Sequence, residues 1–330
     1  MRKPLSWAAL VLVVAGLFVA GLIVAGCEAG PVPVVATPTP AFQAHTPPQL
    51  VGKVLLVKTG DLWLLQGSAF TRLTQATNLR QGRWSSDGQT IACVQMGGNG
   101  SDIVTMPATG GELKALTQNR SLPRESAAWA FRPTWSPASV TPPQIAYLSD
   151  AGTKDLQLWM MTTAGKNPHQ VATVSGLHGG IIGLDWSPDG KTLLLAAYRE
   201  SATSQIWQLD LATLAWTPVT NEKDGAYDPA WSPDGQHIAY VVRHEGRHDI
   251  WVARPDGSQA TPITAAGTCR APAWAPDGGM IAYLSNPTGD FDLWVADVAF
   301  AADGTTTPSN HQQVTQGARL DPDSGLSWTR

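Results

Sequence analysis

Residues 231–264 have the sequence WSPDGQHIAYVVRHEGRHDIWVARPDGSQATPIT, and this stretch contains the pattern on which the fold depends. Its Ser-Pro-Asp-Gly segment (232–235) is typical of a type I turn, because proline presets φ at the second position and glycine favours the fourth. The segments around IAYVV (238–242) and DIWVA (249–253) are rich in β-branched and aromatic residues, which favours half-buried strands. With a first strand ending at the tryptophan and a last strand ending in Ile-Thr, the stretch predicts four consecutive strands.

The same pattern recurs along the chain. A tryptophan that ends an expected first strand occurs six times, at spacings of 51, 51, 45, 43 and 54 residues: Trp84, Trp135, Trp186, Trp231, Trp274 and Trp328. A second tryptophan, in the expected third strand, occurs five times, with Val104 in its place once: Trp63, Trp159, Trp207, Trp251 and Trp294. Most units also close on an apolar residue followed by threonine: Thr74, Thr117, Thr220, Thr264 and Thr315. Four-stranded propeller blades repeat at about 40–50 residues, so the spacing predicts one blade per repeat.

The two ends of the repeat region complete each other. Five full units begin at first-strand tryptophans, and the C-terminus supplies one further first strand around Trp328. The N-terminal part supplies candidate second, third and fourth strands at 54–57, 62–66 and 69–74. We therefore expect an all-β fold over residues 51–330: a six-bladed β-propeller of four-stranded blades, whose sixth blade is built from both ends and removes free sheet edges.

The WSPDG…IAY…DIWV…LT pattern resembles the repeat of the TolB-type β-propeller family, over about residues 51–330. The resemblance implies the propeller fold and an extracytoplasmic location, but it implies little about function, because turn and core residues carry it. Members of that family have an α/β domain before the propeller, where this sequence has a spacer of 23 residues. The repeat is loosely similar to the propeller of prolyl-oligopeptidase-type enzymes, yet no long segment could form their α/β-hydrolase domain. Neither Tol function nor peptidase function is therefore expected to transfer.

Residues 1–26 have the organisation of a secretory signal. Arg2 and Lys3 precede an uncharged apolar run over 5–25, and small residues stand directly before Cys27. This end of the run resembles the lipobox of bacterial lipoproteins, which implies that Cys27 is lipidated and becomes the first residue of the mature protein. The alternative is an uncleaved transmembrane helix, because the run is long enough to span a bilayer. Both hypotheses place the remainder outside the cytoplasm and attached to the cell membrane.

The segment 27–50 is dense in proline and shows no repeat period, which predicts a semi-rigid spacer between the membrane and the propeller.

The formal charge of the chain is −4, and loss of the two basic residues of the signal would make it −6. A chain without a basic excess is a poor partner for nucleic acid. The sequence has neither the G-x-S-x-G motif of a serine nucleophile nor a P-loop, and we expect no cofactor. Cys93 and Cys269 fall in separate repeats, so we expect two unpaired buried thiols rather than a disulfide.

Two motifs could be taken for catalytic chemistry. Residues 244–248 match H-E-x-x-H, but zinc chemistry needs that motif on a helix, and here it lies between two expected strands with Gly246 at its centre. We interpret it as a polar hairpin and predict no metal site. The recurring turn aspartates could also be taken for catalytic carboxylates, but their repetition favours a role within each turn: Asp87, Asp189, Asp234 and Asp277.

A binding surface is predicted where the loops between blades surround the channel mouth, since such loops need not supply the core. The residue four positions before each first-strand tryptophan should recur around this mouth: Arg80, Phe131, Ile182, Tyr227, Arg270 and Ser324. The longest connection between blades, 118–133, adds Arg120, Arg124, Trp129 and Arg132, and His178 and Arg319 are expected on the same face. The predicted partner-binding residues are Arg80, Trp129, Arg132, His178, Tyr227, Arg270 and Arg319, because arginine, tryptophan and tyrosine are enriched at binding hot spots.

Three functions remain open on the sequence alone. The first is a monomeric, non-enzymatic binding propeller that presents its loop face to an envelope protein or peptide. The second is a receptor for a carbohydrate or another small ligand, with Trp129 and Tyr227 stacking on sugar rings. The third is a propeller-type lyase, lactonase or hydrolase, which would need clustered histidines or carboxylates at the mouth, where His178, Asp228 and Asp323 are the candidates.

Overall fold

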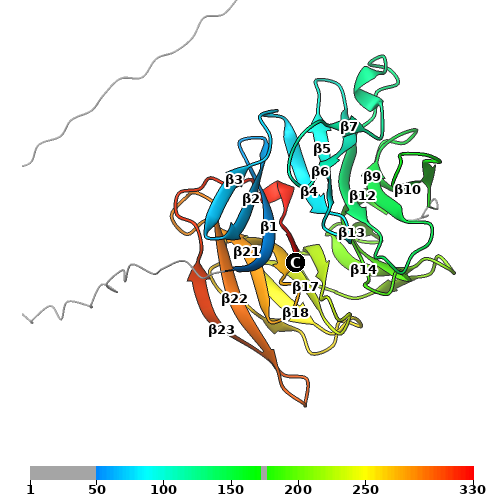
Figure 1. Cartoon of the computed structure of the whole chain (residues 1–330). Coiled ribbons are helices and arrows are strands. Elements are labelled where there is room, and N and C mark those ends of the chain that lie inside the picture. Colours follow the sequence, from blue (N-terminus) through cyan, green and yellow to red (C-terminus); the bar gives the residue numbers. More distant parts are fainter. Residues whose placement is uncertain (1–49, 172–176) are drawn as a thin grey trace, which may run out of the picture. The chain divides into compact units, whose positions relative to one another are not determined.

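Figure 1 shows a computed structural model of the chain, which describes residues 50–171 and 177–330. All described residues belong to one compact unit, Thr46–Arg330. This unit is built of strands arranged in six sheets of four strands each. The predicted six-bladed β-propeller is therefore confirmed.

The blades are numbered by the order of their first strands. Blade 1 contains β4 (Leu79–Trp84), β5 (Thr90–Met96), β6 (Ser101–Pro107) and β7 (Lys114–Ala115). Blade 2 contains β8 (Ala130–Trp135), β9 (Gln144–Ser149), β10 (Gln157–Thr162) and β11 (His169–Gln170), and blade 3 contains β12 (Leu177–Trp186), β13 (Thr192–Arg199), β14 (Gln205–Asp210) and β15 (Trp216–Pro218). Blade 4 contains β16 (Ala226–Trp231), β17 (Ile238–His244), β18 (Arg247–Ala253) and β19 (Thr261–Pro262), and blade 5 contains β20 (Cys269–Trp274), β21 (Met280–Ser285), β22 (Asp292–Phe300) and β23 (Thr306–Gln313).

Blade 6 closes the ring with strands from both ends of the propeller. It contains β24 (Ser327–Thr329), β1 (Leu50–Lys58), β2 (Asp61–Gly67) and β3 (Ala69–Arg72), paired in that order. Trp328 of β24 lies opposite Val54 of β1, and its indole N–H donates to the Val51 carbonyl at 2.8 Å. The predicted closure from both ends is confirmed, and it leaves the last residues of the chain hydrogen-bonded within a sheet.

Antiparallel pairing places the connections on two opposite faces of the ring. The turns between first and second strands, and between third and fourth strands, lie on one face, which we call the turn face. The hairpins between second and third strands lie on the other face, together with the connections that lead from each blade to the next. We call this second face the mouth face. Two 3₁₀ turns, η1 (Asn119–Ser121) and η2 (Pro322–Ser324), belong to its connections.

The core lies between the blades. Six clusters of buried apolar side chains occupy the six interfaces between neighbouring blades. In one of them Trp84 of blade 1 joins Leu55 and Leu62 of blade 6. Apolar burial of this kind is the main favourable contribution to folding, so each blade depends on both of its neighbours.

A bulge interrupts the pairing of every first strand from β4 to β20. In four of these strands the residue three positions before the tryptophan has a left-handed backbone, with φ between 49° and 55°: Gln81, Arg132, Asp228 and Ala271. Such φ values are uncommon outside glycine, and a bulge redirects the side chains beside it. The repeated bulge therefore determines which side chains enter the channel.

The threonine that ends most repeats forms the same hydrogen bonds in five blades. Its Oγ1 accepts from a backbone N–H at the start of the third strand and donates to the side chain of the residue before it, in the pairs Thr74–Asp61, Thr117–Asp102, Thr220–Gln205, Thr264–Asp249 and Thr315–Asp292. The partner side chain also holds the connection to the next blade. Asp292, for example, accepts from the backbone N–H groups of Gly317 and Ala318. The repeat thereby fixes the connections that carry the mouth-face residues.

Candidate functional site

Four of the six positions expected at the rim lie at the mouth-face ends of first strands, whereas Ile182 lies within the longer β12 and Ser324 lies in η2, before β24. Arg80, Phe131, Ile182, Tyr227 and Arg270 belong to β4, β8, β12, β16 and β20, and Ser324 ends η2. The Arg80 side chain is 48% exposed and that of Arg270 is 31% exposed. Phe131, Ile182 and Tyr227 are half-buried, and Ser324 is buried. The rim is therefore formed by large side chains on five of its six positions.

One side of the rim is a polar cluster from blades 4 and 5. The Arg270 guanidinium lies 5.5 Å from the centre of the Tyr227 ring, and its Nη1 lies 3.0 Å from Asp323 Oδ1. The Tyr227 hydroxyl hydrogen-bonds to Nδ1 of His248 in β18. Burial raises the pKa of Tyr227 to about 12, so its hydroxyl remains protonated. Burial and the charges of Arg270 and Arg243 lower the pKa of His248, which favours the neutral imidazole at neutral pH.

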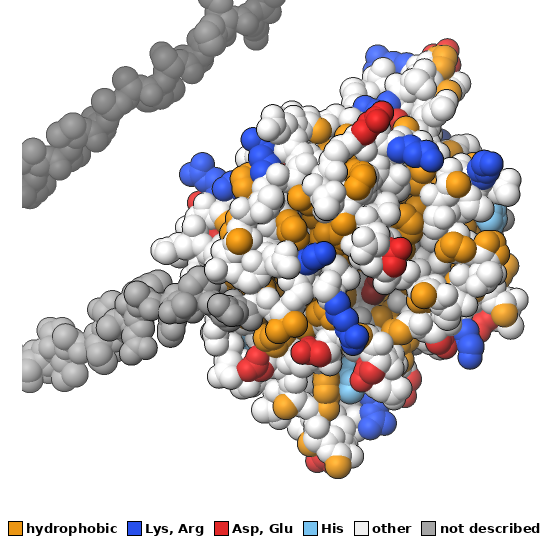
Figure 2. All heavy atoms as spheres, in the orientation of Figure 1, with side chains coloured by type: hydrophobic (Ala, Val, Ile, Leu, Met, Phe, Trp, Pro, Cys, Tyr) orange, Lys and Arg blue, Asp and Glu red, His pale blue; other side chains and the backbone are white. Residues whose placement is uncertain are grey.

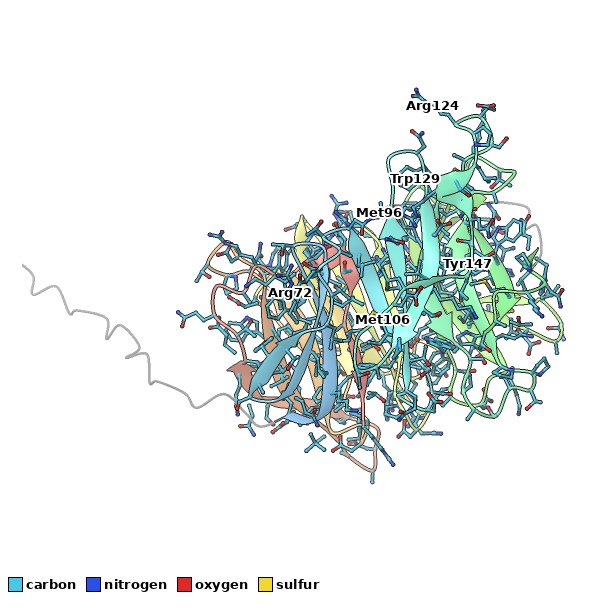
Figure 3. The ribbon with its side chains drawn as sticks, turned by 45° about the horizontal axis from the view of Figure 1, so that its top comes forward. Arg72, Met96, Met106, Arg124, Trp129 and Tyr147 are labelled. Atoms are coloured by element: carbon cyan, nitrogen blue, oxygen red, sulfur yellow. The ribbon has the colours of Figure 1, made fainter. Side chains whose placement is uncertain are left out.

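The other side of the rim, across the ring on blade 2, is aromatic. Trp129 and Phe131 stack with their ring centres 5.9 Å apart and their planes 5° from parallel. The Trp129 backbone N–H donates to Asp150 Oδ1 at 2.7 Å, which holds the end of the connection in place. Figure 3 shows Trp129 at the base of the projecting loop that carries Arg124 near its tip. Both rings are half-buried, so each keeps accessible surface on the mouth face.

Below the rim, side chains from the bulge positions cross the channel. Arg132 of blade 2 places Nη1 3.3 Å from Oδ1 of Asp228 in blade 4, and since these blades are not neighbours the ion pair must cross the channel. Gln81 accepts from the Arg132 backbone N–H at 2.7 Å and donates to the Asp323 carbonyl at 3.3 Å. The Arg132 and Asp228 side chains are 18% and 12% exposed. The mouth therefore has a polar floor, and Arg132 belongs to that floor rather than to the rim.

The remaining residues that were predicted to bind a partner lie apart from these two sides of the rim. Arg319 is 76% exposed, with Nε 3.4 Å from Asp290 Oδ2. Arg80 lies 3.9 Å from Asp321. His178 belongs to β12, but its side chain lies outside the described part of the structure. The structure thus brings Tyr227 and Arg270 together, places Trp129 across the ring from them, and leaves Arg80 and Arg319 at the surface.

The H-E-x-x-H segment forms a hairpin, as predicted. His244 ends β17 and pairs with Arg247 of β18, so Glu245 and Gly246 make a two-residue turn with positive φ at both positions. Within residues 50–171 and 177–330, no three His, Cys, Asp or Glu side chains are grouped closely enough to hold a metal ion. Cys93 and Cys269 are buried free thiols in blades 1 and 5.

The repeated turn aspartates bond within their own turns, which confirms the structural interpretation. Asp87 Oδ1 accepts from the Ser85 hydroxyl at 2.6 Å and from the Gln89 backbone N–H at 3.0 Å. Asp189 and Asp234 repeat both bonds, and Asp277 repeats the backbone bond. These bonds lower the pKa of Asp87, since they favour the ionised carboxylate.

Two charged channel residues were not singled out from the sequence. Arg83 and Asp185 stand directly before Trp84 and Trp186, and both face a cavity in the lower half of the channel. The equivalent residues in the other repeats are uncharged: Thr134, Ala230, Ala273 and Ser327. Comparing this one column across the repeats would have marked the two charges as exceptions.

Figure 2 shows acidic and basic side chains interspersed with apolar ones over the face in view. The rim also contains charges of both signs, in the ion pairs Arg270–Asp323 and Arg80–Asp321. A surface of mixed charge favours specific pairing with a partner over general attraction to a highly charged polymer.

Comparison with known proteins agrees with this architecture. Residues 139–324 match the family model of the TolB beta propeller domain, which is more than half of the chain. The chain belongs to the TolB β-propeller family. A curated relative, the Tol-Pal system protein TolB of Anaeromyxobacter dehalogenans strain 2CP-C, is 34% identical over 80 residues. That alignment spans 24% of this chain and 18% of the relative, so it relates a small part of the two proteins.

Solved structures show the same fold. TolB from Acinetobacter baumannii superposes with a TM-score of 0.65 at 17% identity, over 85% of this chain and 67% of the other. A putative TolB from Agrobacterium tumefaciens gives 0.61 at 16% identity, over 83% and 94% of the two chains. At such low identity, the likeness of this TolB-family chain to them concerns the fold alone.

Proposed function

We propose that this TolB-family chain is a lipid-anchored, extracytoplasmic binding propeller, which engages an envelope protein or peptide through its mouth face. The observation that carries the proposal is the composition of the rim. The stacked Trp129–Phe131 pair lies across the ring from the Tyr227–Arg270 pair, above a floor of paired side chains. Aromatic and arginine side chains dominate the binding energy of protein interfaces, above all where several are held rigidly.

The course of the first strand supports the same orientation. β1 begins at Leu50 on the turn face and runs to the hairpin at Thr59 and Gly60 on the mouth face. A tether that enters at Leu50 therefore joins the propeller on the turn face. Anchored through Cys27, the protein would keep its mouth face free for a partner. Residues 1–49, including Cys27, lie outside the described residues, and no helix within the described ones is long and apolar enough to cross a bilayer.

Family membership favours a protein partner. The curated relatives carry the name of the Tol-Pal system, and the likeness of this chain to them supports a role in the cell envelope. A lyase, lactonase or hydrolase that used a metal ion would need grouped metal-binding side chains at the mouth, and no such group occurs among the described residues. A non-enzymatic binding role is the simplest function that the rim supports.

The binding proposal is tested by crosslinking in the native envelope. The tagged full-length chain is compared with a rim variant, Trp129→Ala/Tyr227→Ala/Arg270→Ala, and with a control variant, Phe70→Ala/Leu214→Ala, which removes one exposed apolar side chain from the outer strand β3 and one from the turn between β14 and β15. A protein crosslinked to the wild type and to the control, but lost from a folded rim variant, is the expected result. Equal capture by all three proteins would overturn the proposal.

The anchor is tested separately by metabolic labelling with a palmitate analogue. The wild type should be labelled and cut before Cys27, whereas Cys27→Ala should be neither. Mass spectrometry of the mature N-terminus measures both. Labelling that survives in Cys27→Ala, or an intact residue 1–26 segment in the mature wild type, would contradict the lipoprotein prediction.

A carbohydrate is the second candidate ligand, because the half-buried Trp129 ring could stack on a sugar. The single substitution Trp129→Ala distinguishes this ligand from a protein partner. Retention of the wild-type chain on an immobilised envelope glycan, lost in Trp129→Ala and kept in Phe70→Ala, would favour this function over a protein partner.

A further inference from the structure

The cavity that Arg83 and Asp185 face opens on the turn face. Its volume is about 220 Å³, and we call it the turn-face cup. Arg83, Asp185 and Ser327 line its inner part, and Pro233 and Pro276 of two Ser-Pro-Asp-Gly turns line its outer part. On the mouth side the Arg132–Asp228 ion pair crosses the channel. The cup is therefore separated from the rim by the polar floor.

Two opposite charges face this cup without pairing to each other. The Arg83 side chain donates through Nη1 to the carbonyls of Gly82 and Leu326, at 3.1 and 2.9 Å. Asp185 accepts through Oδ2 from the Trp231 backbone N–H at 2.8 Å. Nε and Nη2 of Arg83 donate to no side chain or carbonyl of the described residues, and Arg83 and Asp185 form no ion pair with each other, although the Trp186 backbone N–H also favours the ionised Asp185 carboxylate.

The channel environment leaves both charges incompletely compensated. Burial, together with the charge of Arg132, lowers the pKa of Arg83 to about 10. Burial raises the pKa of Asp185 to about 6, against the opposing effects of the Trp231 N–H and of Arg83. Both groups are still charged at neutral pH, and a charge out of bulk water is unfavourable unless a partner satisfies it. A ligand with both charges would satisfy the two groups together.

We propose that the turn-face cup binds a small zwitterion of the α-amino-acid class, with its carboxylate on Arg83 and its ammonium on Asp185. The size of the cup fits this class, because it is smaller than the roughly 300–1,000 Å³ of pockets for drug-sized ligands. The Ser327 hydroxyl accepts from the Trp84 backbone N–H at 3.1 Å and so can donate its proton to the carboxylate. Leu326 and Trp231 supply apolar wall for the ligand side chain.

The absence of a side chain at Gly325 leaves room for the Arg83 guanidinium. A Cβ at Gly325 would lie 2.9 Å from Arg83 Nη2, and the backbone φ of 69° also favours glycine there. The Arg83 carbonyl accepts from the Trp135 indole at 3.2 Å, which fixes the strand that carries it. The cationic wall of the cup is thus held rigidly by blades 1, 2 and 6. Preorganised charges of this kind favour ligand binding, since little ordering is left to occur on association.

The test uses isothermal titration calorimetry on the full-length chain in detergent. The probes are glycine, L-alanine, L-leucine, L-glutamate and L-lysine, with L-alaninamide and N-acetyl-L-alanine as analogues that each lack one charge. At least one amino acid is expected to bind, and removing either of its charges is expected to weaken binding by about tenfold or more. The proposal would be overturned if none of the five amino acids gave a heat of binding at ligand concentrations up to about ten times a millimolar Kd. It would also be overturned if the two analogues bound as tightly as the amino acid that carries both charges.

Variants identify the site and keep it distinct from the mouth. Asp185→Asn retains an acceptor for the Trp231 N–H and so should fold, yet it should lose amino-acid binding by about tenfold or more. Ser327→Ala is a second, milder variant for the carboxylate end. The single substitution Arg270→Ala, at the rim, should leave amino-acid binding as it is in the wild type. Unchanged binding in a folded Asp185→Asn protein, or a crystal soaked with the bound amino acid that shows only water in the cup, would overturn the assignment.

Discussion

The two ends of the channel use charge in opposite ways. At the mouth, the arginines pair with aspartates: Arg270 with Asp323 at the rim and Arg132 with Asp228 in the floor. In the turn-face cup, Arg83 and Asp185 bond to backbone groups and leave part of their hydrogen-bonding capacity facing the cavity. The blades share one backbone plan, so this difference arises from single positions in the first strands. The shared repeat supplies the scaffold, and the exceptions within a repeat column supply the candidates for function.

The largest loss of stability is expected when the ion pair in the floor of the mouth is removed. Arg132→Met should lower the free energy of unfolding by about 3 kcal/mol, because it leaves Asp228 half-buried without its partner. Denaturant unfolding monitored by tryptophan fluorescence measures the change. The matched control is Arg80→Met at the exposed rim, where a loss within about 0.5 kcal/mol is expected. Equal losses in the two variants would show that the floor and the rim do not differ in this way.

A smaller change in the free energy of unfolding, which depends on pH, should distinguish the cup from the mouth. Folding raises the pKa of Asp185 from 3.8 to about 6, so the native state binds this proton more tightly than the unfolded state does. The contribution of this group to stability therefore increases as the pH falls from about 6 to about 4. Its full size is at most about 3 kcal/mol, and solvent that enters the cup reduces it to about 1–2 kcal/mol. Arg83 is the charged group that acts on Asp185, and Arg132 and Asp228 act in turn on Arg83.

The measurement is the difference in unfolding free energy between Asp185→Asn and the wild type at about pH 7 and about pH 5. The asparagine variant removes this titration and leaves the other carboxylates unchanged. Its stability relative to the wild type should be greater at the higher pH and should decrease on acidification. A difference that does not change with pH would mean that the cup solvates Asp185 as well as bulk water does.

The sequence predicted the fold in detail because the information is local and repeated. Turn chemistry at Ser-Pro-Asp-Gly, alternation in the strands and the tryptophan spacing all repeat with each blade, so errors at one repeat are corrected by the others. The same logic predicted the closure by Trp328 and the strands at 54–57, 62–66 and 69–74. Blade numbering from the sequence also placed Tyr227 and Arg270 on neighbouring blades, where they are in contact.

The site was only partly predictable, because its contacts join blades that are distant in sequence. Arg132 was grouped with the rim residues, but the bulge in β8 directs it across the channel to Asp228. No sequence pattern announces a bulge at a non-glycine residue with φ of 52°. Arg83 and Asp185 were not predicted for a different reason: each is a single charge in a column that is otherwise uncharged, so neither belongs to the repeat that the neighbouring core tryptophans define.

The two stacked rings on the aromatic side of the rim should show an interaction free energy of intermediate size. A double-mutant cycle with Trp129→Ala and Phe131→Ala should give an interaction free energy of about 1 kcal/mol, since the two rings stack in parallel at 5.9 Å. Unfolding measurements on the wild type, the two single variants and the double variant supply the four values. Strictly additive losses would mean that the rings are adjacent without stabilising each other, and would weaken the case for a rigid aromatic surface.

The smallest effect on folding is expected at Arg319, and this makes it the most informative residue for binding. Its side chain is 76% exposed, and the one ion pair that it forms within residues 50–171 and 177–330 is with a partly exposed Asp290 at 3.4 Å. Arg319→Ala should therefore change the free energy of unfolding by less than about 0.5 kcal/mol. Because stability is preserved, any loss of the crosslinked partner in this variant reports on the mouth face itself. Full retention of the partner, with loss in Arg270→Ala, would confine the binding surface to the blade 4–5 side of the rim, and a folding defect in Arg319→Ala would show that the connection before η2 depends on this ion pair.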